Sequence, residues 1–181
     1  NAPSADVIGV EFEARKNFGF IFESLRNLSL NINFSLIKST IEMNKEEGQE
    51  YDSRLTFARE GETINDYREL QGQSPYLINA GFMYSNDEIG IETGIFYNVQ
   101  GKTLEVVGFG KNPDVYTQPF HSLNINFSKK FGAEQNSSIS LKVNNLLNET
   151  RESLYDSFGA SSRAFSLREP GRNISLGYSL S

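Results

Sequence analysis

One histidine and no cysteine limit the chemistry that the side chains of this chain can perform. Without cysteine there is no disulfide scaffold, no thiol nucleophile and no cysteine-based zinc or iron–sulfur site. His121 has Asp114 and Ser122 near it in sequence, but proximity in sequence does not make a triad, and this histidine has no evident nucleophile or orienting group. We therefore expect no enzyme, no metal centre and no cofactor.

The residues best suited to contact a ligand lie in two long segments between the patterned parts of the chain. In 101–118 aromatic residues stand between glycines, and 148–170 carries further aromatic residues and an arginine; such side chains can make mobile contacts to a ligand. The other interpretation of both segments is a folded loop tip. The candidate ligand-binding residues are Phe109, Tyr116, Tyr155, Phe158 and Arg163.

A third long segment, 43–74, is acidic, with a net charge of −4. It is either a lid that attracts cations, a calcium site, or a solvated loop. The Asp-x-Asp-x-Asp-Gly spacing of a calcium-binding loop is absent from it, which favours the solvated loop.

The elements that must position these segments are β-strands, because apolar and polar residues alternate along much of the chain. In 28–36, for example, every second residue is Leu, Ile or Phe, and the residues between them are Ser or Asn. A period of two predicts a strand with two different faces, and most of these strands are long enough for a tilted transmembrane β-strand. The pattern predicts seven strands and no amphipathic helix, with the strands at 8–14, 28–36, 76–84, 89–99, 123–127, 139–143 and 174–180.

The composition of the 181-residue chain excludes several classes of protein. Its net charge of −6 and pI of about 4.9 repel phosphate groups, so we expect no nucleic-acid partner. With 38% hydrophobic and 22% charged residues, the chain is not fully disordered. No uninterrupted apolar run exceeds three residues, so hydropathy predicts no membrane-spanning helix.

The connections between the predicted strands alternate between short and long. The turn at about 19–27 is of moderate length, 85–88 and 132–137 are short, and 43–74, 101–118 and 148–170 are long. Bacterial outer-membrane barrels have short periplasmic turns and long extracellular loops. We therefore expect an all-β fold, an antiparallel transmembrane β-barrel. Because single-chain barrels have even strand numbers, seven strands predict that further strands precede residue 1.

Several segments resemble one family of such barrels. The Glu-Pro-Gly-Arg step at 169–172 and the alternating strand that follows it to Ser181 resemble the closing strand of TonB-dependent outer-membrane receptors, in the style of the Bacteroidetes. Residues 141–148 resemble the penultimate strand of that family, with its V-x-N-L-x-N pattern. Segments that look like earlier strands of the family are 9–16, 74–81 and 95–102.

The resemblance implies a 22-stranded barrel closed by an N-terminal plug, in which residues 1–181 form the C-terminal portion, about the last seven strands, without the plug. It implies a receptor of the bacterial outer membrane that binds a scarce nutrient at its extracellular loops and imports it with TonB-coupled energy. The implied partners are outer-membrane lipid, the plug and the missing strands, the TonB complex through the plug and, as in glycan and peptide importers, a surface lipoprotein. The alternative functions are a soluble carbohydrate-binding β-sandwich and an outer-membrane barrel enzyme.

Overall fold

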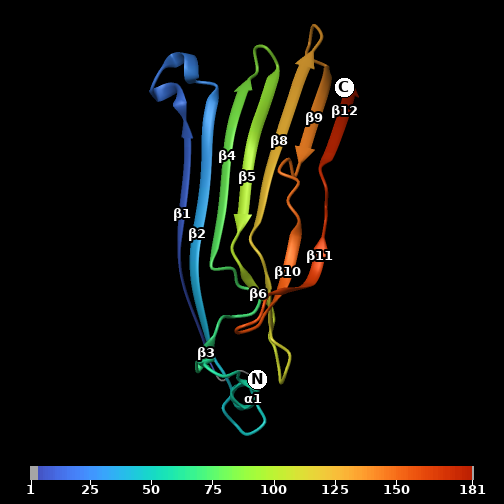
Figure 1. The fold of residues 1–181 in the computed structure, drawn as a ribbon. Helices are drawn as coiled ribbons and strands as arrows, with labels where there is room; N and C mark the ends of the chain where they lie inside the picture. The colour runs from blue at the N-terminus through green and yellow to red at the C-terminus, as the bar shows by residue number, and fades with distance from the viewer. Residues whose placement is uncertain (1–3, 181) are drawn as a thin grey trace.

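One long antiparallel sheet forms most of the computed structural model, which describes residues 4–180 (Figure 1). Each of the seven predicted strands overlaps one of its strands, so the all-β class is confirmed. Residues 1–3 and 181 of the expected barrel portion lie outside the described residues. The seven strands, in their order across the sheet, are β1 (Ala5–Asn17), β2 (Leu28–Glu42), β4 (Tyr76–Asn86), β5 (Ile91–Gln100), β8 (Phe120–Phe131), β9 (Ser137–Asn144) and β12 (Asn173–Leu180).

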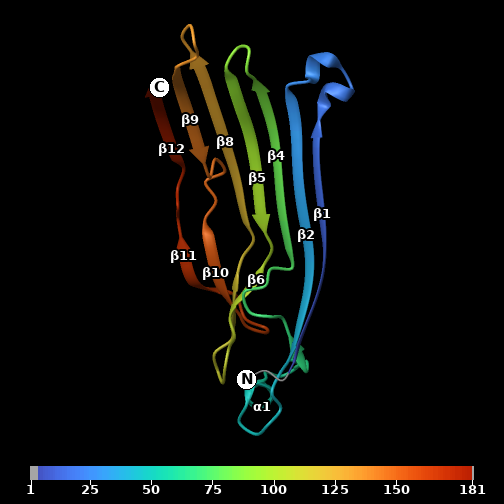
Figure 2. The ribbon, with the colours of Figure 1, turned by 180° about the vertical axis from the view of Figure 1, so that it is seen from behind.

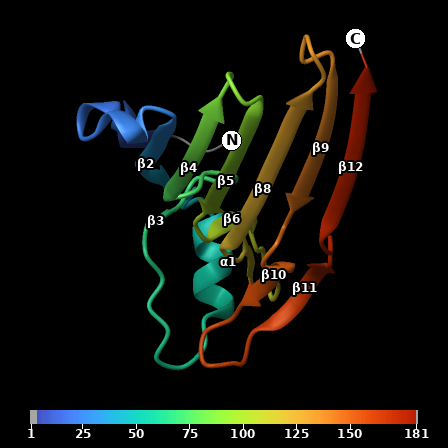
Figure 3. The same ribbon diagram turned by 90° about the horizontal axis from the view of Figure 1, so that it is seen from above.

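The sheet is open. Viewed from above, its strands follow one another in a single row that ends at β12 (Figure 3). Across residues 4–180, β1 and β12 form the two edges and do not pair with each other, so these residues form no closed barrel. Seven strands are fewer than the eight of the smallest barrels.

The pairing register places most of the apolar positions of the sheet on one face. Phe34 of β2 lies opposite Phe12 of β1 on one side and Ile78 of β4 on the other. Ile95 of β5 lies opposite Ile125 of β8 in the same way. Because directly paired residues point to the same side of a sheet, the alternation of each strand stays in phase with its neighbours. One face is therefore almost continuously apolar, and the other carries mainly Ser, Asn and Gly.

Phe96 is an exception on the polar face, and two glycines make room for its ring. Gly81 lies directly opposite it on β4. A Cβ atom built on Gly81 would lie 3.0 Å from the ring of Phe96, and one built on Gly94 would lie 2.8 Å from it. Contacts of that length are too short for carbon atoms, so both positions require glycine while the ring stays in place.

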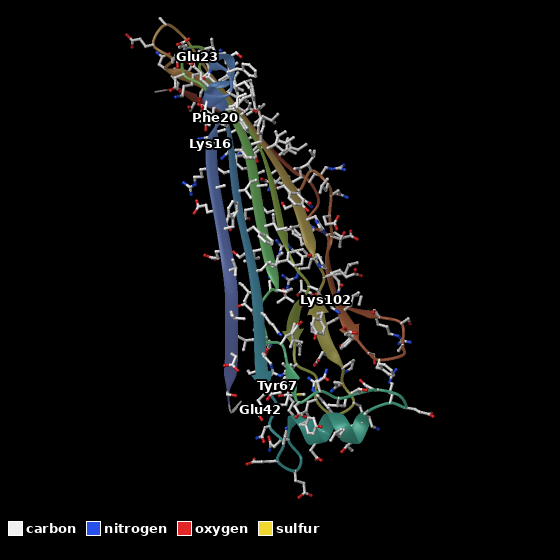
Figure 4. All side chains as sticks on the ribbon, turned by 90° about the vertical axis from the view of Figure 1, so that its left-hand side faces the viewer. Lys16, Phe20, Glu23, Glu42, Tyr67 and Lys102 are labelled. Atoms are coloured by element: carbon white, nitrogen blue, oxygen red, sulfur yellow. The ribbon has the colours of Figure 1, made fainter. Side chains whose placement is uncertain are left out.

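Short and long connections lie at opposite ends of the sheet, as the sequence predicts (Figures 1 and 2). The β1–β2 connection contains two short 3₁₀ helices, η1 (Phe18–Phe20) and η2 (Glu23–Leu25), and the other short connections are single turns. Figure 4 shows Phe20 and Glu23 at this end, and Glu42 and Tyr67 at the end of the long connections.

The long connections are folded, as one interpretation of 101–118 and 148–170 expects, but the sequence pattern does not locate their helix and strands. Their buried centre is made by Leu104 and Val115, at 0% and 1% exposure. With two to eight residues each, these elements are too short to show a period in the sequence. They are α1 (Glu50–Phe57), β3 (Tyr67–Arg68), which pairs with β2, and a second sheet in the order β11 (Arg163–Arg168), β10 (Arg151–Asp156), β7 (Asp114–Thr117) and β6 (Thr103–Val106). We call this region the loop layer.

Two of the segments that carry the family resemblance, 141–148 and 169–181, touch each other where β9 ends and β12 begins. Asn145 and Asn148 of the V-x-N-L-x-N pattern have φ angles of 52° and 57°, a left-handed conformation that Asn adopts more readily than most residues. The Asn145 side chain donates to the carbonyl of Gly171 at 2.9 Å, and Arg172 donates through Nε to the carbonyl of Leu146 at 2.8 Å. These contacts fix the entry of the chain into β12.

Candidate functional site

Four of the five candidate ligand-binding residues line two adjoining pockets in the loop layer. Tyr116 and Phe158 line a pocket of about 330 Å³. Tyr155 and Arg163 line a second pocket of about 350 Å³. Phe109 lines neither and is 58% exposed. The two pockets adjoin because they share four lining residues, Arg59, Asn112, Pro113 and Ser157.

Pairing within the second sheet brings two of the long connections together at this site. The central strand β7 pairs with β6 on one side and with β10 on the other. Tyr116 of β7 lies opposite Leu154 of β10 and Leu104 of β6. The connections 101–119 and 145–172 thereby form one surface, although their candidate residues are far apart in the sequence.

The third long connection is held to this surface by an arginine of α1. Arg54 donates from both terminal nitrogens to the carboxylate of Asp114, at 3.0 and 2.8 Å, and lies 3.4 Å from Glu50. Burial disfavours its charge, but the hydrogen bonds and the charge of Asp114 outweigh burial, so the pKa of Arg54 is raised. Glu50 also accepts from Arg68 at 2.6 Å.

Two further hydrogen bonds join the three connections. Ser53 of α1 accepts from the backbone N–H of Gly110 at 2.9 Å. Arg59, just beyond α1, donates to the carbonyl of Phe158 at 2.8 Å. Arg59 therefore stands at the junction of all three long connections, and it lines both adjoining pockets.

Tyr116 is a neutral phenol in this setting. Burial, helped by the nearby carboxylates of Glu69, Asp114 and Asp156, raises its pKa to about 12. The ammonium of Lys102 lies 4.2 Å from the centre of its ring and pairs with Asp156 at 2.7 Å. At physiological pH the Tyr116 hydroxyl keeps its proton and can donate a hydrogen bond to a ligand.

Glu105 of β6 is held as a carboxylate by two hydroxyl groups. Ser153 and Thr117 donate to it, the latter at 2.8 Å, and these hydrogen bonds lower the pKa of Glu105 despite partial burial. The contacts join β6, β7 and β10, so the charge of this side chain is coupled to the pairing of the second sheet.

His121, Asp114 and Ser122 do not assemble into one site. The Nδ1 atom of His121 lies 2.6 Å from the hydroxyl of Tyr97. Asp114 is bound to Arg54, and Ser122 donates to Asn124 at 3.2 Å. Because His121 and Ser122 are adjacent in β8, they point to opposite faces of the sheet.

Asparagine side chains form a ladder on the polar face of the long sheet. Asn98 donates to Asn79 at 2.7 Å, and Asn124 donates to Asn98 at 3.4 Å. The backbone N–H of Asn145 donates to the same Asn124 side chain at 3.0 Å. Amide groups both donate and accept, so the ladder presents a row of neutral hydrogen-bonding groups on this face.

The acidic segment 43–74 is partly neutralised by its own basic residues. Lys45 pairs with Asp66 at 2.8 Å, and this hydrogen bond lowers the pKa of Asp66. Within the part of the chain that the structure describes, no three acidic or histidine side chains gather closely enough to hold a metal ion. In the same part of the chain, no helix is long and apolar enough to cross a membrane.

Sequence reasoning missed several residues of the site, above all Arg59, Asn112 and Ser157. Arg59 was visible as a basic residue in an acidic segment, but nothing in the sequence shows that it meets Phe158, 99 residues away. Comparisons of the chain with protein-family models, with curated proteins and with solved structures find no match. Function is therefore inferred from the residues and their geometry.

Proposed function

We propose that this chain forms part of the wall and the outer loops of a TonB-dependent outer-membrane receptor, which binds a scarce nutrient at its long loops and imports it with TonB-coupled energy. The observation that carries the proposal is the apolar face of the long sheet. A sheet that is apolar on one face and polar on the other, with short turns at one end and long connections at the other, suits a barrel wall between lipid and lumen.

The apolar face has exposed side chains from one edge strand of the sheet to the other. Ile8 on β1, Ile95 on β5 and Leu176 on β12 are 71%, 48% and 77% exposed. Water-soluble monomers rarely leave contiguous apolar patches larger than a few hundred Å² uncovered. Contact with lipid removes such a face from water and recovers about 25 cal/mol for each Å² of apolar surface.

The same observation counts against the soluble β-sandwich. In a sandwich the second sheet packs on the apolar face of the first. Here the second sheet lies beyond the ends of β8 and β9, in line with the long connections (Figure 1). It leaves Ile95 and Leu176 exposed.

The polar face suits contact with the plug of such a receptor, and the loop layer suits binding of its ligand. The asparagine ladder formed by Asn79, Asn98 and Asn124 would meet a plug and water in the lumen, since neutral amides exchange hydrogen bonds with both. The adjoining pockets around Arg59 would face the exterior, where a ligand arrives. The contacts of Asn145 and Arg172 give the motifs of the family resemblance a shared structural role, which supports the same assignment.

The test of this function uses the complete polypeptide that carries this chain. We expect it in the outer-membrane fraction, migrating differently on gels before and after heating, and binding the periplasmic domain of TonB. Ile125→Arg on the apolar face should prevent assembly, since a charge at the bilayer centre costs about 2–4 kcal/mol. Asn126→Arg, its neighbour on the polar face, is the matched control. A polypeptide found in the soluble fraction, or one in the outer membrane with no affinity for TonB, would contradict the proposal.

A further inference from the structure

We propose that the pocket between Arg59 and Arg163 binds a small polyhydroxylated organic anion, whose carboxylate or phosphate group is held by the two guanidinium groups. This inference rests on the proposed function, because it names the class of ligand that the outer loops of the receptor would take. The pocket has a volume of about 350 Å³, within the range of small-molecule sites.

The pocket is formed where the three long connections meet. One connection contributes Arg59, a second contributes Asn112 and Pro113, and the β10–β11 hairpin contributes the rest. The residues contributed by this hairpin are Tyr155, Ser157, Ala160, Ser161 and Arg163. A site built from three separate connections exists only when the loop layer is folded, which suits a specific ligand better than a surface charge on one loop.

The charged side chains that line this pocket are all of one sign. Its lining contains two arginines and no Asp or Glu. Among the described residues, neither guanidinium has a carboxylate within 4.0 Å, whereas the loop-layer arginines Arg54 and Arg68 are both paired with acidic residues. In a chain with a net charge of −6, this is a local cationic site. Arginine presents a planar fork of N–H groups that matches carboxylate and phosphate oxygens.

Arg59 is positioned rather than free to move. It donates to the carbonyl of Phe158 at 2.8 Å, which uses one of its five N–H groups and leaves the others for a ligand. The carboxylate of Glu62 accepts from the backbone N–H of Arg59 at 2.9 Å. Glu62 lines the neighbouring pocket and not this one, so it fixes the backbone of Arg59 without placing its charge in the proposed site.

The rest of the lining is neutral and rich in hydrogen-bonding groups. Ser157 and Ser161 contribute hydroxyls, and Asn112 contributes an amide. Tyr155 contributes an aromatic side chain, whose ring is fixed edge-on against Phe165 with 5.5 Å between centroids. Groups that both donate and accept are suited to the hydroxyls of a sugar, and an aromatic ring can pack against the apolar face of its ring. An acidic sugar has both an anionic group for the two arginines and a hydroxylated ring for the neutral part of the lining.

The binding test titrates the complete, purified receptor with three probes that share a sugar ring. Galacturonate carries a carboxylate, galactose 6-phosphate carries a phosphate, and galactose is neutral. We expect at least one of the two anions to bind about tenfold or more tightly than galactose, and to lose affinity as salt is raised. Which anion binds more tightly identifies the anionic group. If neither anion binds more tightly than galactose, the proposal is overturned.

Matched variants locate the binding. Arg163→Gln should weaken binding of the preferred anion about tenfold or more, since hydrogen bonds to charged groups are the stronger kind. Arg163→Lys should lose less, because it keeps the charge without the fork. Arg168→Gln removes the same charge from an exposed position of the same strand outside the pocket, and should leave the affinity unchanged. Equal effects of Arg163→Gln and Arg168→Gln would overturn the site.

The localisation of the polypeptide is measured separately from binding. A receptor that sits in the outer membrane but does not prefer an anion overturns this pocket and leaves the proposed function standing. A polypeptide in the soluble fraction overturns the proposed function, and the titration of that soluble protein still decides whether the pocket binds anions.

Discussion

Four arginines of the loop layer form two pairs, one that holds the layer together and one that lines a pocket. Arg54 and Arg68 are about one-fifth exposed or less and are paired with Glu50 or Asp114. Arg59 and Arg163 are exposed and line the cationic pocket. The first pair bears on the stability of the layer, and the second pair bears on the ligand.

Removing the partner of Arg54 should loosen α1. Asp114→Asn leaves a partly buried guanidinium with only Glu50 beside it, at 3.4 Å, and should lower the free energy of opening of the loop layer by about 1–3 kcal/mol. Hydrogen exchange of the α1 amides measures this. Asp156→Asn, which breaks the more exposed pair with Lys102, is the control and should cost under about 1 kcal/mol. Equal protection of α1 in both variants would contradict the role of Asp114.

Glu105 should make the stability of the second sheet depend on acidity. Hydrogen bonds from Ser153 and Thr117 lower its pKa from the ordinary value of 4.5, so folding favours the carboxylate. This stabilisation is complete above about pH 4.5 and is lost as the pH falls through the lowered pKa. Between pH 4.5 and pH 3, the thermal midpoint of the loop layer should therefore fall less steeply in Glu105→Gln than in the unsubstituted protein. Identical pH profiles of the two proteins would count against the coupling.

At the scale of elements, the sequence predicts what is periodic and misses what is short. The seven strands of the long sheet each show several alternating residues, and the register that keeps the apolar positions together follows from that alternation. The alternation does not mark where these strands end. β2, expected at 28–36, continues to Glu42, because pairing with β1 continues to Ile41.

The second sheet and α1 could not be predicted in the same way. β6 and β7 have four residues each, and their pairing depends on contacts between separate connections. Tyr116 and Phe158 were identified as candidate residues from their types and their segments. The pairing of Arg54 with Asp114, 60 residues apart, left no signal in one sequence, because any acidic residue of the loops could have served.

The packing of Phe96 across β4 and β5 gives a prediction at this scale. Gly94→Ala should destabilise the sheet by about 1–3 kcal/mol, because the new methyl group overlaps the ring of Phe96. When Phe96 is also changed to Ala, adding Gly94→Ala should cost little further stability, because the ring that the methyl group overlaps is gone. The two changes are therefore not additive. Urea unfolding of the lipid-inserted protein measures both.

Gly177→Ala is the control for that cycle. A Cβ atom there would meet only the hydroxyl of Ser140, at 2.7 Å, and this small side chain can rotate away. Strict additivity of Gly94→Ala and Phe96→Ala would show that the ring does not require the glycine.

At the scale of the whole molecule, the proposed function depends on one face of the long sheet. Each of the seven strands along the row contributes Leu, Ile, Val, Phe or Tyr to it, and the opposite face contributes mainly amides, hydroxyls and glycines. The loop layer gathers at one end of this two-sided sheet (Figure 4). The central claim is that the apolar face lies against lipid.

The most direct test is a nitroxide scan along β8 in the complete polypeptide, inserted in lipid vesicles. The 181-residue chain has no native cysteine, so single cysteines are introduced at 122–127 and a nitroxide label is attached to each. The collision of each label with oxygen and with a water-soluble nickel complex is then measured. If the apolar face lies against lipid, the collision rates should alternate from one residue to the next. Labels at Leu123, Ile125 and Phe127 should collide with oxygen and not with nickel. Labels at Ser122, Asn124 and Asn126 should show the opposite preference. Equal access of nickel to both sets of positions would contradict a lipid-facing sheet.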